Sequence, residues 1–80
     1  MENKKIAVLG GGSWATAIVK ILTETVDVVN WWMRDEDCIA HIKKYHHNPN
    51  YIQSIEFNID KLNLSSNLQK TIDDSDVIIV

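Results

Sequence analysis

The 80-residue chain contains one cysteine and one proline, and its three glycines are consecutive. A single thiol excludes an intramolecular disulfide scaffold and favours a reducing, cytoplasmic compartment. The eight Lys and Arg residues are scattered and the formal net charge is −3, so the sequence offers no basic patch for nucleic acid. No apolar run approaches the roughly 20 residues that span a bilayer. A hydrophobic fraction of 45% is nevertheless typical of a folded globular chain.

Apolar periodicity predicts alternating strands and helices. Strands are expected over residues 6–9, 26–33, 62–65 and 76–80, and helices over residues 13–24, from 35 to Asn48-Pro49, and briefly over 68–72 after a cap at Ser66 or Asn67. Residues 51–61 fit a short exposed strand or an extended loop. Strands that alternate with crossover helices favour an α/β fold with a doubly wound parallel sheet.

The final run, residues 76–80, is typical of a strand buried on both faces of a parallel sheet. A central strand without its outer neighbours is poorly supported in so short a chain. We therefore interpret the sequence as the front portion of a longer protein, whose sheet is truncated after its fourth strand.

Gly10, Gly12 and Ala15 form the pattern G-x-G-x-x-G/A between the first predicted strand and the first predicted helix. Gly10 allows the tight turn, Gly12 has no Cβ to block a diphosphate, and Ala15 is small enough for the helix to lie close to the strand. The helix directs its free N–H groups at the phosphates. The motif indicates an incomplete, N-terminal, Rossmann-type dinucleotide-binding domain over residues 1–80. A glycine-rich turn without a ligand is the alternative.

The end of the second predicted strand bears on the type of dinucleotide, because an acid there marks NAD and a basic residue marks NADP. Arg34 occupies this position and Asp35 follows it. A guanidinium suits a 2′-phosphate and stacks on adenine, so the expected cofactor is NADP or NAD, with NADP favoured by Arg34. Asp35 is expected either to accept from a ribose hydroxyl or to cap the next helix. An ordinary surface arginine is the alternative for Arg34.

The remaining clusters indicate structure rather than chemistry. Cys38 and His41 are at most half of a metal site, so no metal is expected. The histidines are expected on the surface, and the three aspartates before the last strand in a solvated loop. Trp31 and Trp32 are expected to pack on opposite faces of the sheet. Trp14 lies at the first helical turn, where packing and shielding of a cofactor are both reasonable.

Residues 9–17 resemble the Gly-x-Gly-Ser-Trp-Gly-Thr-Ala signature of the NAD(P)-dependent glycerol-3-phosphate dehydrogenases. Residues 31–35 resemble that family's Trp-x-x-Arg at the end of the second strand. Residues 48–52 are similar to its Asn-x-x-Tyr-Leu, and residues 75–80 to its Ala-Asp-Val-Ile-Ile. The resemblance extends in order over essentially the whole chain.

The resemblance implies a whole enzyme that interconverts dihydroxyacetone phosphate and sn-glycerol 3-phosphate by hydride transfer with NAD(P)H. It implies that Ser13, Trp14 and Arg34 bind the cofactor and that Tyr51 lies near the cofactor cleft. The family's catalytic lysines and substrate domain have no counterpart here. No catalytic residue is therefore assigned, and the small phosphorylated substrate is expected on the absent domain. A homodimer is compatible with this interpretation.

Three positions depart from the family pattern. Ala15 replaces the third glycine, and Met33 stands where many relatives have a polar residue, which leaves Arg34 as the only cation at the strand end. Ile52-Gln53-Ser54 replaces Leu-Pro-Gly, so the turn after Tyr51 is expected to differ. Two other functions remain open on the same fold, because fold does not fix function. They are a non-catalytic nucleotide-sensing domain and a related hydroxy-acid or keto-acid reductase.

Overall fold

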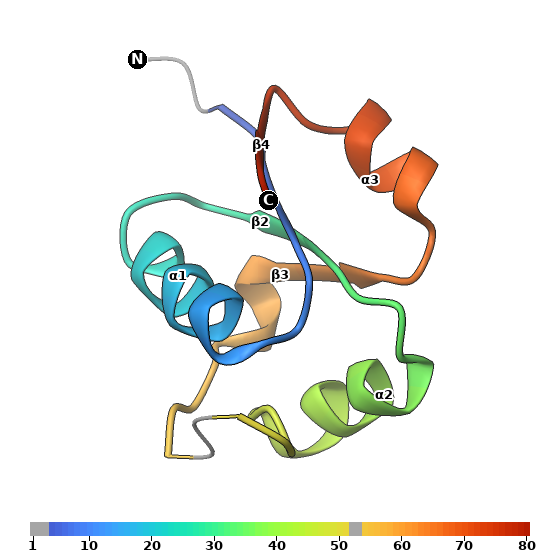
Figure 1. Cartoon of the computed structure of the whole chain (residues 1–80). Coiled ribbons are helices and arrows are strands. Elements are labelled where there is room, and N and C mark those ends of the chain that lie inside the picture. Colours follow the sequence, from blue (N-terminus) through green and yellow to red (C-terminus); the bar gives the residue numbers. More distant parts are fainter. Residues whose placement is uncertain (1–3, 52–53) are drawn as a thin grey trace.

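The computed structural model describes residues 4–51 and 54–80 (Figure 1). Four strands form one parallel sheet in the order β3-β2-β1-β4, which confirms the predicted doubly wound α/β fold. The elements, in chain order, are β1 (Ile6–Leu9), α1 (Ser13–Thr23), β2 (Val29–Trp32), α2 (Glu36–Tyr45), the 3-10 turn η1 (Ile59–Lys61), β3 (Leu62–Ser65), α3 (Leu68–Asp73) and β4 (Val77–Ile79). None of the helices in the described ranges is long and apolar enough to cross a membrane.

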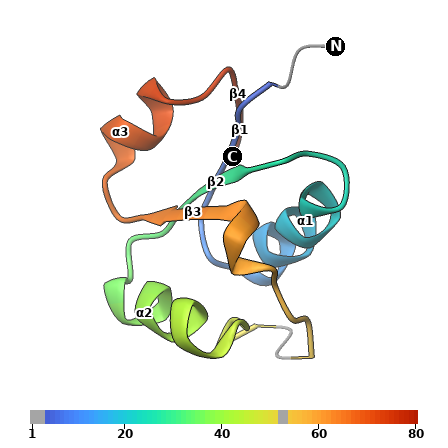
Figure 2. The same ribbon diagram turned by 180° about the vertical axis from the view of Figure 1, so that it is seen from behind.

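The register of the sheet divides its side chains between two helix layers. Val8 pairs with Trp31, and both are fully buried in the core against α1 and α2. Ala7 pairs with Asn30, whose Nδ2 donates to Ser75 Oγ at 2.9 Å, directly after α3. Figures 1 and 2 accordingly show α3 on the opposite side of β2 and β3 from α1 and α2.

Side-chain caps mark where two of the helices begin, and a left-handed residue marks where one of them ends. The Asp35 carboxylate accepts from the N–H groups of the first turn of α2, and Asn67, one of the two predicted caps, accepts from the Lys70 N–H at the start of α3. Helix α2 ends at Tyr45, before the predicted stop at Asn48-Pro49. It ends there because His46 adopts a left-handed conformation, with φ of 67°.

The structure moves the start of one predicted strand and decides between the two alternatives for residues 54–58. Strand β2 begins at Val29 rather than at residue 26, because the Val26 N–H bonds the Leu22 carbonyl and closes the turn after α1. In this chain β4 lies at the edge of the sheet and Val77 is 39% exposed, so the expected burial of this strand on both faces stays a prediction. Residues 54–58 form a loop, which was one of the two alternatives, and Phe57 is buried in it, with its ring edge-on to Trp31 at 5.3 Å.

Candidate functional site

The three glycines form the turn that leads from β1 into α1, at the carboxyl edge of the sheet. Gly10 has φ of +113°, a conformation that favours glycine, as expected for the first residue of the tight turn. Its N–H donates to the Trp32 carbonyl at 2.9 Å, and its carbonyl accepts from Trp31 Nε1 at 2.6 Å. Both the N–H and the carbonyl of Gly10 are thus hydrogen-bonded to β2. The turn follows β1, which has β2 and β3 on one side and β4 on the other. Ligands of open α/β sheets usually bind at such a point, where the strand order reverses.

Gly12 is the N-cap of α1, and no side chain caps the helix there. A Cβ built on Gly12 meets nothing within 4 Å, so the space in front of it is open. A Cβ on Gly11, in contrast, meets Met33 Sδ at 3.5 Å. The first turn of α1 carries no acidic residue, so its N–H groups and the positive end of the helix dipole are available to an anion.

A hollow of about 310 Å³ opens beside this turn. It is lined by residues from the turn, from the end of β2 and the start of α2, and from the loop after α2: Gly11, Gly12, Met33, Arg34, Asp35, Cys38, Asn50 and Tyr51. Three predicted site residues, namely Gly12, Arg34 and Tyr51, therefore meet at one place although up to 39 positions separate them in the sequence. Ile52 and Gln53, where the sequence departs from the family pattern, lie outside the described residues.

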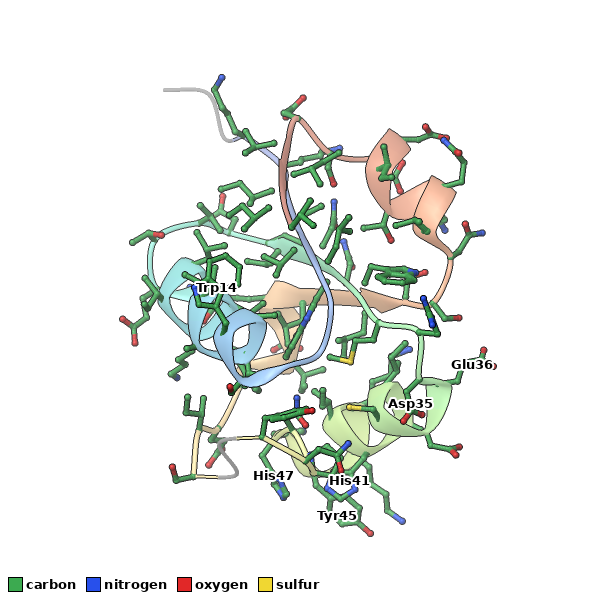
Figure 3. The ribbon with its side chains drawn as sticks, viewed as in Figure 1. Trp14, Asp35, Glu36, His41, Tyr45 and His47 are labelled. Atoms are coloured by element: carbon green, nitrogen blue, oxygen red, sulfur yellow. The ribbon has the colours of Figure 1, made fainter. Side chains whose placement is uncertain are left out.

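The other predicted residues lie around the hollow without lining it. Ser13 is the exposed first residue of α1. Trp14 is 58% exposed and lies on α1, apart from Asp35 at the start of α2 (Figure 3). Ala15 is buried in the core, as expected of a small residue that lets α1 approach the sheet. Gly10 provides the bend but no surface of the hollow.

Arg34 and Asp35 differ in their partners. Asp35 Oδ1 accepts from the N–H groups of Asp37 at 2.9 Å and Cys38 at 3.2 Å. Of its two predicted roles, the structure therefore supports the helix cap. Arg34 is exposed, and its side chain forms no ion pair or hydrogen bond with another described residue. Its guanidinium is available to a ligand.

Cys38 contributes a neutral thiol to the wall of the hollow. Burial, and secondly the negative charge of Asp35, raises the pKa of the Cys38 thiol from its ordinary value. The thiol lies 3.9 Å from Asn48 Oδ1. A thiol that ionises less readily than usual is not an activated nucleophile.

Asn48 is a buried residue near the hollow that was not among the predicted site residues, although it begins the motif of residues 48–52 that resembles the family pattern. The side chain is 0% exposed and hydrogen-bonds to Gly11, Thr16, Asn50 and Tyr51. A buried amide with all of its polar atoms bonded is the kind of feature that only the folded structure reveals.

The histidines gather at the far end of α2, away from the glycine turn. The His41 ring lies 4.7 Å from the Tyr45 ring and 4.9 Å from the His47 ring (Figure 3). His46 is exposed, and His41 and His47 are both partly exposed. Within residues 4–51 and 54–80, no three His, Cys, Asp or Glu side chains are arranged to hold a metal ion.

Comparison with known proteins gives consistent results. Residues 5–80 match the family model described as the NAD-dependent glycerol-3-phosphate dehydrogenase N-terminus. The glycerol-3-phosphate dehydrogenase (NAD(P)+) of Teredinibacter turnerae is 38% identical over 77 residues, which are 96% of this chain and 22% of that protein. The enzyme of the same name from Pseudomonas aeruginosa is 36% identical over 99% of this chain and 23% of its own length.

A solved structure agrees with these sequence relatives. The crystal structure of glycerol-3-phosphate dehydrogenase from Coxiella burnetii superimposes with a TM-score of 0.81 at 25% identity, covering 95% of this chain and 23% of that one. The chain therefore spans less than a quarter of the length of these relatives. It belongs to the NAD-dependent glycerol-3-phosphate dehydrogenase family and corresponds to the N-terminal region of its members.

Proposed function

We propose that the complete protein carrying this chain is an NAD(P)-dependent glycerol-3-phosphate dehydrogenase and that this chain holds its dinucleotide. The observation that carries the proposal is the convergence of Gly12, Arg34 and Tyr51 on one hollow beside an uncapped helix N-terminus. The family of the chain supports the reaction and the substrate pair, dihydroxyacetone phosphate and sn-glycerol 3-phosphate.

The glycine turn is the proposed diphosphate site. The open space before Gly12 leaves room for a diphosphate, and the first-turn amides of Ser13 and Trp14 lie at the positive end of the α1 dipole. Gly10 makes the bend and Ala15 allows the close packing of α1 on the sheet, so these two residues act through the backbone. Trp14, with its exposed ring, is proposed to shield the cofactor.

Arg34 and Tyr51 are proposed to hold the adenosine end of the cofactor, since they line the hollow that adjoins the turn. The free guanidinium of Arg34 suits a 2′-phosphate, which favours NADP over NAD. Asp35 also lines this hollow, and its Oδ1 is engaged as the cap of α2.

The bound nicotinamide supplies the hydride chemistry, while this chain supplies binding and orientation. The phosphorylated substrate and the groups that move its protons are assigned to the remainder of the complete protein. A cytoplasmic location fits the lone, buried cysteine. The product sn-glycerol 3-phosphate connects the proposed reaction to glycerophospholipid metabolism.

The test is turnover by the complete protein. We expect NADPH or NADH to be oxidised when dihydroxyacetone phosphate is added, measured by the loss of cofactor absorbance. Dihydroxyacetone without its phosphate is the control and should react far more slowly. Absence of turnover with both cofactors would contradict the enzyme assignment, and cofactor binding without turnover would instead indicate a nucleotide sensor.

A further inference from the structure

Asn48 connects the glycine turn to the opposite wall of the hollow. Its Nδ2 donates to the Gly11 carbonyl at 3.1 Å and to Thr16 Oγ1 at 3.0 Å. Its Oδ1 accepts from the N–H groups of Asn50 at 2.9 Å and Tyr51 at 3.3 Å. One fully buried amide thus joins two segments that are 37 residues apart in the sequence.

The bond to Gly11 has a consequence for the amide that follows. In a trans peptide the carbonyl and the next N–H point in opposite directions. Because the Gly11 carbonyl is directed at the buried Asn48, the Gly12 N–H is directed away from Asn48. Thr16 continues the arrangement, since its Oγ1 donates to the Gly12 carbonyl at 2.7 Å and so fixes the next peptide of the turn.

We propose that Asn48 is a positioning residue for dinucleotide binding: it turns the amides of the glycine turn outward and holds Tyr51 in register with them. This inference rests on the proposed function. Asn48 is fully buried and acts through Gly11, Thr16 and the Tyr51 backbone. An amide is required, because the position needs a donor on one side and an acceptor on the other.

The first test is Asn48→Asp in the complete protein, with NADPH and NADH titrated by calorimetry. The variant keeps an acceptor for Asn50 and Tyr51 but loses the donor to Gly11, so the Kd should rise about tenfold or more. At saturating cofactor, kcat and the KM for dihydroxyacetone phosphate should stay near the wild-type values. A raised cofactor Kd with unchanged kcat and substrate KM distinguishes a positioning role from a general loss of structure.

Asn30→Asp is the matched control. Asn30 is also a buried amide, and it bonds Ser75 and Asn63 on the α3 side of the sheet, away from the hollow. The same chemical change there should lower the melting temperature without raising the cofactor Kd. If Asn48→Asp weakens binding no more than Asn30→Asp does, the proposal is wrong.

Thr16→Val tests the hydrogen bonds between Asn48 and the glycine turn without adding a charge. It also tests the proposal if Asn48→Asp does not fold. Valine removes the hydroxyl that accepts from Asn48 and donates to Gly12, so the Kd should rise about fivefold, whereas Thr16→Ser should restore wild-type binding. Equal affinity for the two variants would overturn the proposal, since charge alone would then explain any effect at Asn48. Failure of the wild-type protein to bind either dinucleotide would instead refute the proposed function.

Discussion

Arg34 and Asp35 show how adjacent residues of opposite charge take separate tasks at the end of β2. The Asp35 carboxylate turns toward α2 and accepts from two backbone N–H groups there, which satisfies donors that every helix start leaves unpaired. Arg34 is exposed beside the hollow and has no such partner among the described residues. The acid therefore stabilises the fold, and the base is the residue that is free to recognise a ligand.

Arg34→Ala should change cofactor preference more than turnover. A charge-assisted contact to a 2′-phosphate contributes about 1.5–3 kcal/mol, so the ratio of kcat/KM for NADPH to that for NADH should fall about tenfold to a hundredfold. Arg34→Lys keeps the charge but loses the planar guanidinium, so its NADPH-to-NADH ratio should lie between those of the wild-type protein and Arg34→Ala. Steady-state kinetics with both cofactors measures the ratio, with Lys70→Ala on α3 as a surface-charge control. An unchanged ratio would remove Arg34 from the cofactor site.

At the scale of elements, two neighbouring glycines in the β1–turn–α1 unit can be compared directly by substitution with alanine. Gly12→Ala places a methyl group in open space, at an N-cap with φ of −74°, so stability should change by less than about 1 kcal/mol. The same methyl group should obstruct a diphosphate and raise the dinucleotide Kd about tenfold. Gly11→Ala is the control, because its methyl group meets Met33 at ordinary contact distance and leaves the open space free. Calorimetry that finds equal affinities for both variants would contradict the assigned diphosphate site.

Local sequence patterns predicted those elements whose cause is local. The strand–glycine–helix unit, the Asp35 cap and the four strands follow from short-range periodicity and capping chemistry. Phe57 was predicted as part of an exposed strand or loop, because its burial depends on Trp31, 26 positions earlier. Asn48 belongs to a motif noted in the sequence, but its hydrogen bonds could not be predicted, since these partners lie on the glycine turn and α1. Three of the residues proposed from the sequence, Gly12, Arg34 and Tyr51, line the hollow, but the long-range contacts around them could be described only from the structure.

At the scale of the whole molecule, the parallel order β3-β2-β1-β4 brings the glycine turn, the end of β2 and the loop after α2 to one edge of the sheet. The strand β4 at the other side of β1 exposes Val77 and Ile78, each at 39%. The chain also spans less than a quarter of its relatives' length. The hollow therefore lies where β1 and β2 are adjacent, and each of these two strands is paired with a strand on both of its sides.

The buried thiol gives the folding of the whole molecule a specific dependence on pH. Burial and Asp35 raise the pKa of Cys38 above its ordinary value of 9.0 in the folded chain, whereas the unfolded chain ionises at that ordinary value. Below both values the thiol is protonated in either state and stability is unaffected. As pH rises past about 9, the unfolded state loses its proton first, so the free energy of unfolding falls until the folded pKa is reached. Cys38→Ala lacks this component but shares every other titrating group. The urea midpoint of the complete protein should therefore fall more steeply than that of the variant between about pH 8 and pH 10, and parallel curves would show that the thiol is not held neutral by the fold.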